Sequence, residues 1–197
     1  MSDWKMNDKP ALLIMHMQNG IVGRHKELLT NSGVIRKQQD LLKAFRSKDL
    51  PVIYINVMLN PPFIDKLPAY GYLWEQVTGT NNNPKDLEVI SELTPKAGEP
   101  ILFNWPTGAF NNSGLDRALK LCGAETLVAA GFSTNGVVYS LMQGAADRYY
   151  STIIPRDASA AASEKVQEVF MDLIAPALSL VTTTEDVITH LINSNSS

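Results

Sequence analysis

Short runs of apolar residues recur along this chain and alternate with longer stretches in which apolar residues return every three or four positions. The nearly continuous apolar runs cover residues 11–15, 52–57, 101–103, 126–130, 151–154 and 178–181. Apolar runs of this length without alternation are typical of strands buried on both faces, as in a parallel sheet covered by helices. We therefore predict six strands in one central, mostly parallel sheet.

The stretches between these runs carry the signals that begin and end helices. Side chains that can cap a helix stand where three of the stretches begin, at Ser113, Ser163 and Thr183. The first of these helices is expected to end at Gly123, and an earlier helix is expected over residues 33–46. Regular alternation of strands and helices predicts an α/β fold, a doubly wound three-layer sandwich of Rossmann type with right-handed crossovers.

One segment, residues 59–84, breaks this alternation. It combines prolines, aromatic residues and the asparagine run at 81–83. A loop of this length within a compact domain usually serves as a lid, a binding loop or a subunit contact. A plain surface insertion is the alternative, which the aromatic residues disfavour. Nothing else divides the chain, so residues 1–197 are expected to form a single domain.

Composition and charge narrow the class of protein. The chain is 45% hydrophobic and 19% charged, as is ordinary for a globular protein. Its net charge of −3 and its scattered Lys and Arg residues predict no binding to nucleic acid or to an anionic membrane. No apolar run approaches the roughly 18 residues needed to cross a bilayer, and the first residues lack the apolar stretch of a signal peptide. We expect a cytoplasmic enzyme or a small-molecule-binding protein.

Polar and aromatic side chains follow the ends of the predicted strands. Ligands of open parallel sheets bind at the carboxyl ends of the strands, where the strand order switches. The residues expected at that edge are His16, Gln18, Asn19, Asn104, Trp105, Thr107, Phe110, Ser133, Asn135, Gly136, Arg156 and Asp157. The loop 131–136 leads into a helix expected near Asn135, so its backbone N–H groups could hold a carboxylate or an oxyanion. A plain helix cap explains the same residues equally well.

Three of these segments resemble the isochorismatase-like cysteine hydrolase family. Residues 11–19 resemble its apolar first strand, which ends in Asp-x-Gln-Asn, and residues 100–110 resemble its third strand with a lysine before Ser-Ala-Phe. Residues 127–138 resemble the stretch in which Gly-x-x-Thr-x-x-Cys-Val carries the nucleophile. The resemblance covers almost the whole chain. It implies the family's sandwich fold, a hydrolytic activity and a homo-oligomer, either a dimer or a tetramer.

The resemblance also implies a catalytic Asp, Lys and Cys, but these positions hold His16, Asn104 and Val137. Valine can neither attack nor ionise, so a covalent thiol route is closed. Cys122, late in a predicted helix, is interpreted as a buried structural cysteine. True isochorismatases resemble this family and also lack the thiol, yet they keep the acidic residue that is His16 here.

His16 is then the remaining candidate for acid–base catalysis, because an imidazole exchanges protons near neutral pH. Asn104 could orient water or substrate. A hydrogen-bonded pocket histidine without a catalytic role is the alternative. His25 and His190 are expected to be solvated. With three scattered histidines, the sequence predicts no metal site and no cofactor.

Two functions stay open. The first is a hydrolase of a small cyclic or aromatic acid, amide or enol ether that acts without a cysteine nucleophile. Its pocket would include Gly136 and Val137, and Trp105, Phe110 and Tyr139 would grip the ring; lyase or isomerase chemistry would suit a lone histidine as well. The second is a catalytically inactive pseudoenzyme that serves as a small-molecule-binding or assembly protein.

Overall fold

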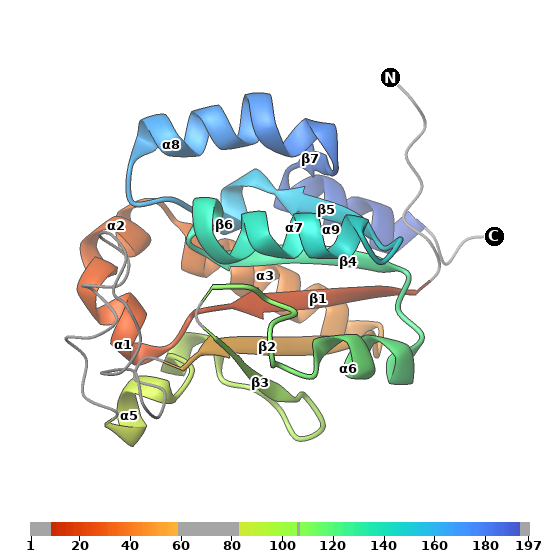
Figure 1. The fold of residues 1–197 in the computed structure, drawn as a ribbon, viewed down its shortest axis with the longest axis horizontal. Helices are drawn as coiled ribbons and strands as arrows, with labels where there is room; N and C mark the ends of the chain where they lie inside the picture. Colours follow the sequence, from red (N-terminus) through yellow and green to blue (C-terminus); the bar gives the residue numbers. More distant parts are fainter. Residues whose placement is uncertain (1–8, 59–82, 106, 194–197) are drawn as a thin grey trace.

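A parallel sheet forms the centre of the computed structural model, which describes residues 9–58, 83–105 and 107–193 (Figure 1). The strands are β1 (Pro10–Met15), β2 (Val52–Val57), β3 (Ile101–Asn104), β4 (Thr126–Phe132), β5 (Ser151–Pro155), β6 (Ser159–Ala160) and β7 (Leu180–Thr182). They pair in parallel in the order β3-β2-β1-β4-β5-β7, with the short β6 beside the end of β4. The six predicted strands are confirmed, although β3, β4, β5 and β7 end later than the apolar runs indicated, and the short β6 was not predicted.

Helices cover both faces of this sheet (Figure 1). They are α1 (Asn19–Val22), α2 (Lys26–Asn31), α3 (Val34–Ser47), α5 (Pro84–Leu87), α6 (Leu115–Cys122), α7 (Tyr139–Ala146), α8 (Glu164–Val169) and α9 (Thr184–Asn193). Leu12 and Ile14 of β1 pack in one core cluster with residues of α3 and α9, whereas Leu13 and Met15 pack with residues of α6 and α7. Because side chains alternate along a strand, β1 is buried on both faces. The predicted three-layer sandwich is therefore confirmed.

The three predicted helix caps have different outcomes. At α9 the hydroxyl of Thr183 accepts from the N–H of Asp186 at 3.2 Å, and the Asp186 carboxylate accepts from the N–H of Thr183 at 3.2 Å. This reciprocal pair is a capping box with an aspartate. At α6 the cap position belongs to Gly114, while the Ser113 hydroxyl still accepts from the first helical N–H at 3.1 Å. Ser163 precedes α8 but its side chain makes no capping hydrogen bond.

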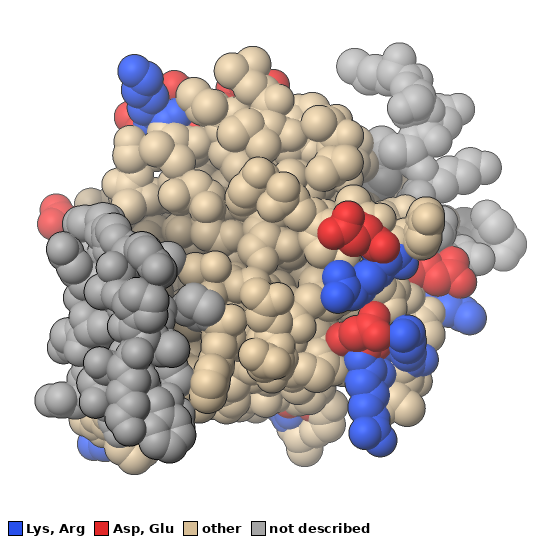
Figure 2. All heavy atoms as spheres, viewed as in Figure 1, with Lys and Arg blue, Asp and Glu red and all other residues tan. Residues whose placement is uncertain are grey.

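The face formed by α6, α7 and α8 is largely uncharged at its centre (Figure 2). Charged side chains gather at one edge of this view, over α6, where Asp116 forms ion pairs with Lys120 at 2.7 Å and with Arg148 at 3.8 Å. Cys122 at the end of α6 is exposed, so its interpretation as a buried cysteine is wrong. Exposed ion pairs of this kind stabilise a fold by at most about 1 kcal/mol, so they do not explain the position of α6.

The sequence predicted a lid or interface loop over residues 59–84. Most of the predicted lid or interface segment 59–84 lies outside the described residues. Its last two residues are described: Asn83 caps α5 by accepting from the N–H of Lys85 at 3.1 Å, and Pro84 is the first residue of that helix.

Among the helices of the described ranges, none is both long enough and apolar enough to cross a membrane.

Candidate functional site

The three positions that depart from the hydrolase pattern lie at the carboxyl edge of the sheet. His16 directly follows β1, Asn104 is the last residue of β3, and Val137 lies in η4 (Thr134–Val138), a single π-helical turn between β4 and α7. Strand β2 separates β1 from β3, so the His16 side chain crosses the end of β2 to reach Asn104. Its Nε2 lies 2.9 Å from Asn104 Oδ1.

The backbone of His16 explains how its ring reaches that far. Its φ of 56° is left-handed, which is uncommon for a residue with a Cβ, and the chain turns there at the end of β1. Its N–H still donates to the carbonyl of Ile55 at 2.7 Å. Asn104 stands two residues after Leu102, which packs against the core cluster of the α6 and α7 face, and Val137 belongs to that cluster. All three positions are therefore brought to one face of the sheet.

Burial controls the protonation of His16. Only 7% of the residue is exposed, and burial lowers the pKa of His16 to about 4, although the hydrogen bond with Asn104 acts in the opposite direction. The imidazole is therefore neutral at pH 7 and carries a single N–H. Since Asn104 Oδ1 can only accept, Nε2 holds that proton in this arrangement, and Nδ1 keeps a lone pair.

The amide of Asn104 is only half used. Asn104 is fully buried, and its Nδ2 has no hydrogen-bond partner among the described residues. A buried polar group without a partner costs about 1–3 kcal/mol, so native proteins pair nearly all of them with protein, water or ligand. This N–H group is thus a donor available to a water molecule or to a substrate oxygen beside His16.

Gln18 and Asn19 are both hydrogen-bonded to backbone groups, and their predicted contact with substrate stays a prediction. The Gln18 amide donates to the carbonyls of Val57 at 3.0 Å and Asp86 at 3.3 Å, and its Oε1 accepts from the N–H of Val57 at 2.7 Å. Asn19 donates to the carbonyl of Lys85 at 2.9 Å. These bonds join the ends of β1 and β2 to α5, and they use both N–H groups of the Gln18 amide.

The aromatic residues expected to grip a ring pack around α7. The Phe110 ring lies so close to Gly144 that a Cβ there would come within 2.7 Å of it, and it stacks on Tyr150 with centroids 6.5 Å apart. Tyr139 meets Phe170 edge to face at 6.0 Å. Both rings contribute to packing, and their assignment to the pocket stays a prediction. Trp105 is 38% exposed in the loop after β3, and Thr107, in the same loop, is half-buried.

The loop after β4 continues into η4 rather than directly into an α-helix. The Thr134 hydroxyl donates to Gln167 of α8 at 2.7 Å, and the N–H of Gly136 donates to the Ser133 carbonyl at 3.0 Å. Val137 is 1% exposed in the apolar core, whereas Asn135 is exposed. One of the N–H groups expected to hold an anion, that of Gly136, is therefore already paired.

The position of His25 was not predicted from the sequence. Its ring lies 4.6 Å from that of Phe132 at the end of β4, and the residue is half-buried, so the expectation of a solvated side chain is wrong. Burial and the neighbouring Arg24 lower the pKa of His25. The peptide bond between Phe132 and Ser133 is cis.

No group of three or more His, Cys, Asp or Glu side chains converges as a metal-ligand set within the described part of the chain.

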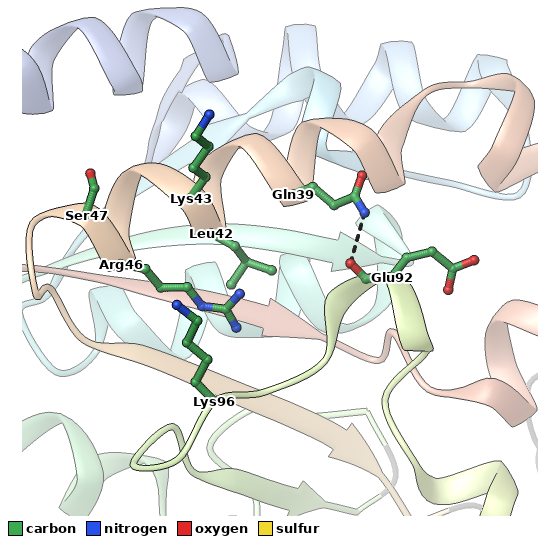
Figure 3. Close-up of a pocket in the computed structure, with 7 residues that line it drawn as sticks. All are labelled: Gln39, Leu42, Lys43, Arg46, Ser47, Glu92 and Lys96. Atoms are coloured by element: carbon green, nitrogen blue, oxygen red, sulfur yellow. Dashed lines mark hydrogen bonds between the residues drawn. The ribbon is translucent and has the colours of Figure 1, made fainter.

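A hollow of about 470 Å³ lies between α3 and the segment 91–99 (Figure 3). Its Arg46 donates to the Glu99 carboxylate through Nε and Nη2, both at 2.7 Å, and so is already paired. Lys43 points away from Arg46 and Lys96 (Figure 3), so these cations do not converge on one point. The hollow adjoins the last turn of α3, which precedes the start of β2, and so lies away from the edge where parallel sheets bind ligands.

Known proteins resemble the chain over nearly its full length. A sequence profile of the isochorismatase domain matches residues 10–186. The isochorismatase family protein YwoC of Bacillus subtilis is 28% identical over 186 residues, 90% of this chain and 92% of its own. Maleamate amidohydrolase of Pseudomonas putida is 28% identical over 157 residues, 76% of this chain and 71% of its own.

Solved structures show the same likeness. An isochorismatase family protein from Burkholderia thailandensis superposes with a TM-score of 0.81 at 25% identity, over 96% of this chain and 98% of its own. N-carbamoylsarcosine amidase from Thermoplasma acidophilum superposes with a TM-score of 0.70 at 26% identity, over 90% of this chain and 97% of its own.

Proposed function

The chain belongs to the isochorismatase family, and on this premise we propose that it hydrolyses a small cyclic or aromatic acid, amide or enol ether without a cysteine nucleophile. Two of the similar proteins, maleamate amidohydrolase and N-carbamoylsarcosine amidase, are named for splitting amide-type C–N bonds in small molecules. The observation that carries the proposal is the buried His16–Asn104 hydrogen bond, which leaves a lone pair on His16 Nδ1 and a free N–H on Asn104.

These two groups suit an attack by water on an amide. His16 Nδ1 would take a proton from water as the water oxygen bonds to the carbonyl carbon, and the carbonyl electrons would move to its oxygen. Asn104 Nδ2 would donate a hydrogen bond to that oxygen. The imidazolium would then give its proton to the leaving nitrogen as the C–N bond breaks, which regenerates the neutral ring.

The lowered pKa of His16 sets the balance between these two proton transfers. With a pKa of about 4, Nδ1 is roughly 300-fold less basic than an unperturbed imidazole, so proton removal from water is the harder step. The imidazolium that forms is correspondingly acidic, which favours protonation of the leaving group. A substrate carboxylate bound beside the ring would raise its pKa and ease the first step.

A pseudoenzyme is the second candidate, and Val137 favours it. At the position where the family resemblance implies the nucleophile, Val137 is buried in the apolar core, so neither a thiol nor a water-accessible group stands there. Such a protein would keep the fold and bind a small molecule without turning it over.

Turnover measured across amides, carbamates and vinyl ethers tests the proposal. We expect kcat/KM to be level from about pH 5 upward and to fall as His16 is protonated, with a midpoint near the pKa of about 4. Replacement His16→Asn should abolish turnover, because asparagine tolerates the left-handed backbone but cannot exchange the proton. The matched control His190→Asn, on α9, should retain it. Ligand binding without turnover, or full activity of His16→Asn, would contradict the proposal.

The homo-oligomer expected from the resemblance stays a prediction. Beyond the site, apolar side chains on α8 and the turns that follow it are exposed, among them Val169 at 40%, Leu173 at 74% and Leu178 at 49%. Contiguous exposed apolar residues often mark contacts between proteins. Light scattering coupled to gel filtration would measure the mass of the particle, with Leu173→Glu expected to reduce it and Lys165→Glu to leave it unchanged.

A further inference from the structure

A larger cavity, of about 680 Å³, lies at the carboxyl edge of the sheet between α2, the start of α3, residues 156–161 and α8. Val34 and Ala160 in its wall belong to the core cluster of the α3 face, whereas the His16–Asn104 pair lies on the opposite face. Figure 1 shows α2 and the first turn of α8 at the same end of the sheet. Both the volume and the position are those of small-molecule sites in parallel α/β proteins.

The charges that line this cavity are not balanced. Arg156 is paired with Asp172 at 2.9 Å, and Asp157 is paired with Lys37 at 3.3 Å. Glu27 on α2 and Glu164 on α8 also line the cavity, and neither has an ion-pair partner among the residues that the structure describes. Two carboxylates in the lining, one from α2 and one from α8, therefore lack an ion-pair partner among the described residues and favour a positively charged occupant.

The remaining lining is either apolar or already hydrogen-bonded. Gln167 accepts from the Thr134 hydroxyl and donates to the carbonyls of Arg156 at 3.2 Å and Ser159 at 2.9 Å. Its amide is therefore fully used and offers no donor to an anionic ligand. Leu28 and Ala161, together with Val34 and Ala160, supply an apolar wall of the kind that binds the body of a small ligand.

We propose that this cavity binds a small organic cation, an amine, amidine or guanidinium group on an apolar body, between Glu27 and Glu164. The site is separate from the His16–Asn104 pair and does not depend on the function proposed for that pair. Gln167 is in the cavity wall and accepts a hydrogen bond from Thr134 at the start of η4. A ligand in the cavity would therefore lie one hydrogen-bonded side chain away from the turn that contains Val137.

Titration of the isotope-labelled full chain with benzylamine tests this site, with benzyl alcohol and benzoate as the neutral and anionic molecules of matched shape. We expect benzylamine to bind most tightly and to shift the amide NMR signals of Ala160, Ala161 and Gln167. The double replacement Glu27→Gln and Glu164→Gln should weaken benzylamine binding roughly fivefold, because each exposed carboxylate contributes a modest attraction. Glu168→Gln, on α8 but outside the cavity lining, is the matched control and should bind as the unaltered chain does.

Three results would overturn the proposal. Benzoate or benzyl alcohol binding as tightly as benzylamine would show that the carboxylates do not select the ligand. Unchanged benzylamine affinity in the double variant would place the site elsewhere, as would signal shifts confined to residues around His16. Absence of any benzylamine binding at millimolar concentration would exclude the site. Both glutamates are exposed, so the variants should fold, and thermal melting checks that they do.

Discussion

The burial of His16 makes the stability of the fold depend on pH in a defined window. The pKa of His16 is about 4 in the folded protein, against the ordinary value of 6.5 expected when the chain is unfolded. Between these values the unfolded chain binds the proton and the folded chain does not. The contribution of the neutral, buried ring is therefore complete above about pH 6.5 and is lost progressively as the pH falls toward 4.

The size of this loss follows from the width of the window. One proton taken up by the unfolded state alone costs about 1.4 kcal/mol of unfolding free energy for each pH unit. Across the interval between the two pKa values of His16 the loss amounts to about 3 kcal/mol. Total stabilities of single domains are about 5–15 kcal/mol, so an effect of this size is measurable.

Urea denaturation of the unaltered protein and of His16→Asn, followed by circular dichroism at several pH values, measures the effect. Carboxylates titrate in both proteins and cancel in the difference, and asparagine accepts the φ of 56° at this position. We expect the stability advantage of the histidine protein to shrink by about 3 kcal/mol on acidification. Parallel curves for the two proteins would refute the reasoning, because the imidazole would then gain its proton without penalty.

Three further predictions concern the neighbours of this histidine. Replacement Asn104→Leu should lower the pKa of the imidazole further, as NMR titration would show, because the hydrogen bond that His16 donates to Asn104 now raises it. The free energy of unfolding should change by less than about 1 kcal/mol, since removal of the unpaired Nδ2 offsets the loss of a partner for His16 Nε2. Gly131→Ala should destabilise by about 2 kcal/mol or more in urea denaturation, because a Cβ there would overlap the Met15 carbonyl oxygen. Val137→Cys should form no acyl adduct detectable by mass spectrometry with amide substrates, because no carboxylate or lysine stands at the positions that would activate the thiol.

The strands were predictable because a strand that is buried on both faces carries apolar residues at nearly every position. The bounds of β2 equal its apolar run, since both of its neighbours and both helical layers exclude water from it. The end of β4 was missed because Gly131 and Phe132 precede a polar turn and looked like part of it, although Gly131 pairs with Met15 of β1. The π-helical turn η4 was not foreseeable, since no local residue pattern distinguishes it from the first turn of an α-helix.

The residues that lie at the candidate site could be predicted from the sequence, but the hydrogen bonds between them could not. Strand ends in a parallel sheet share one edge, so His16 and Asn104 could be expected near each other. Their hydrogen bond also needs the left-handed backbone at His16 and the placement of β2 between β1 and β3. Neither feature can be predicted from the local sequence. The same limit applies to Gln18, whose backbone partners come from two segments distant in the chain.

The three departures from the family pattern form one physical change rather than three separate losses. The resemblance implies a carboxylate, an ammonium and a thiol at the positions of His16, Asn104 and Val137, a set whose charges compensate one another in a buried place. Removing one charge of a buried pair leaves the other uncompensated, at a cost of about 3–5 kcal/mol, whereas replacing every charged member with neutral groups avoids that cost. Here the neutral ring donates a hydrogen bond to the amide oxygen at 2.9 Å, and valine fills the third position within the apolar core. A single replacement such as Asn104→Lys would therefore bury an unpaired ammonium, and the mechanism proposed for this site relies instead on the Nδ1 lone pair of an uncharged imidazole and the hydrogen bonds of an amide.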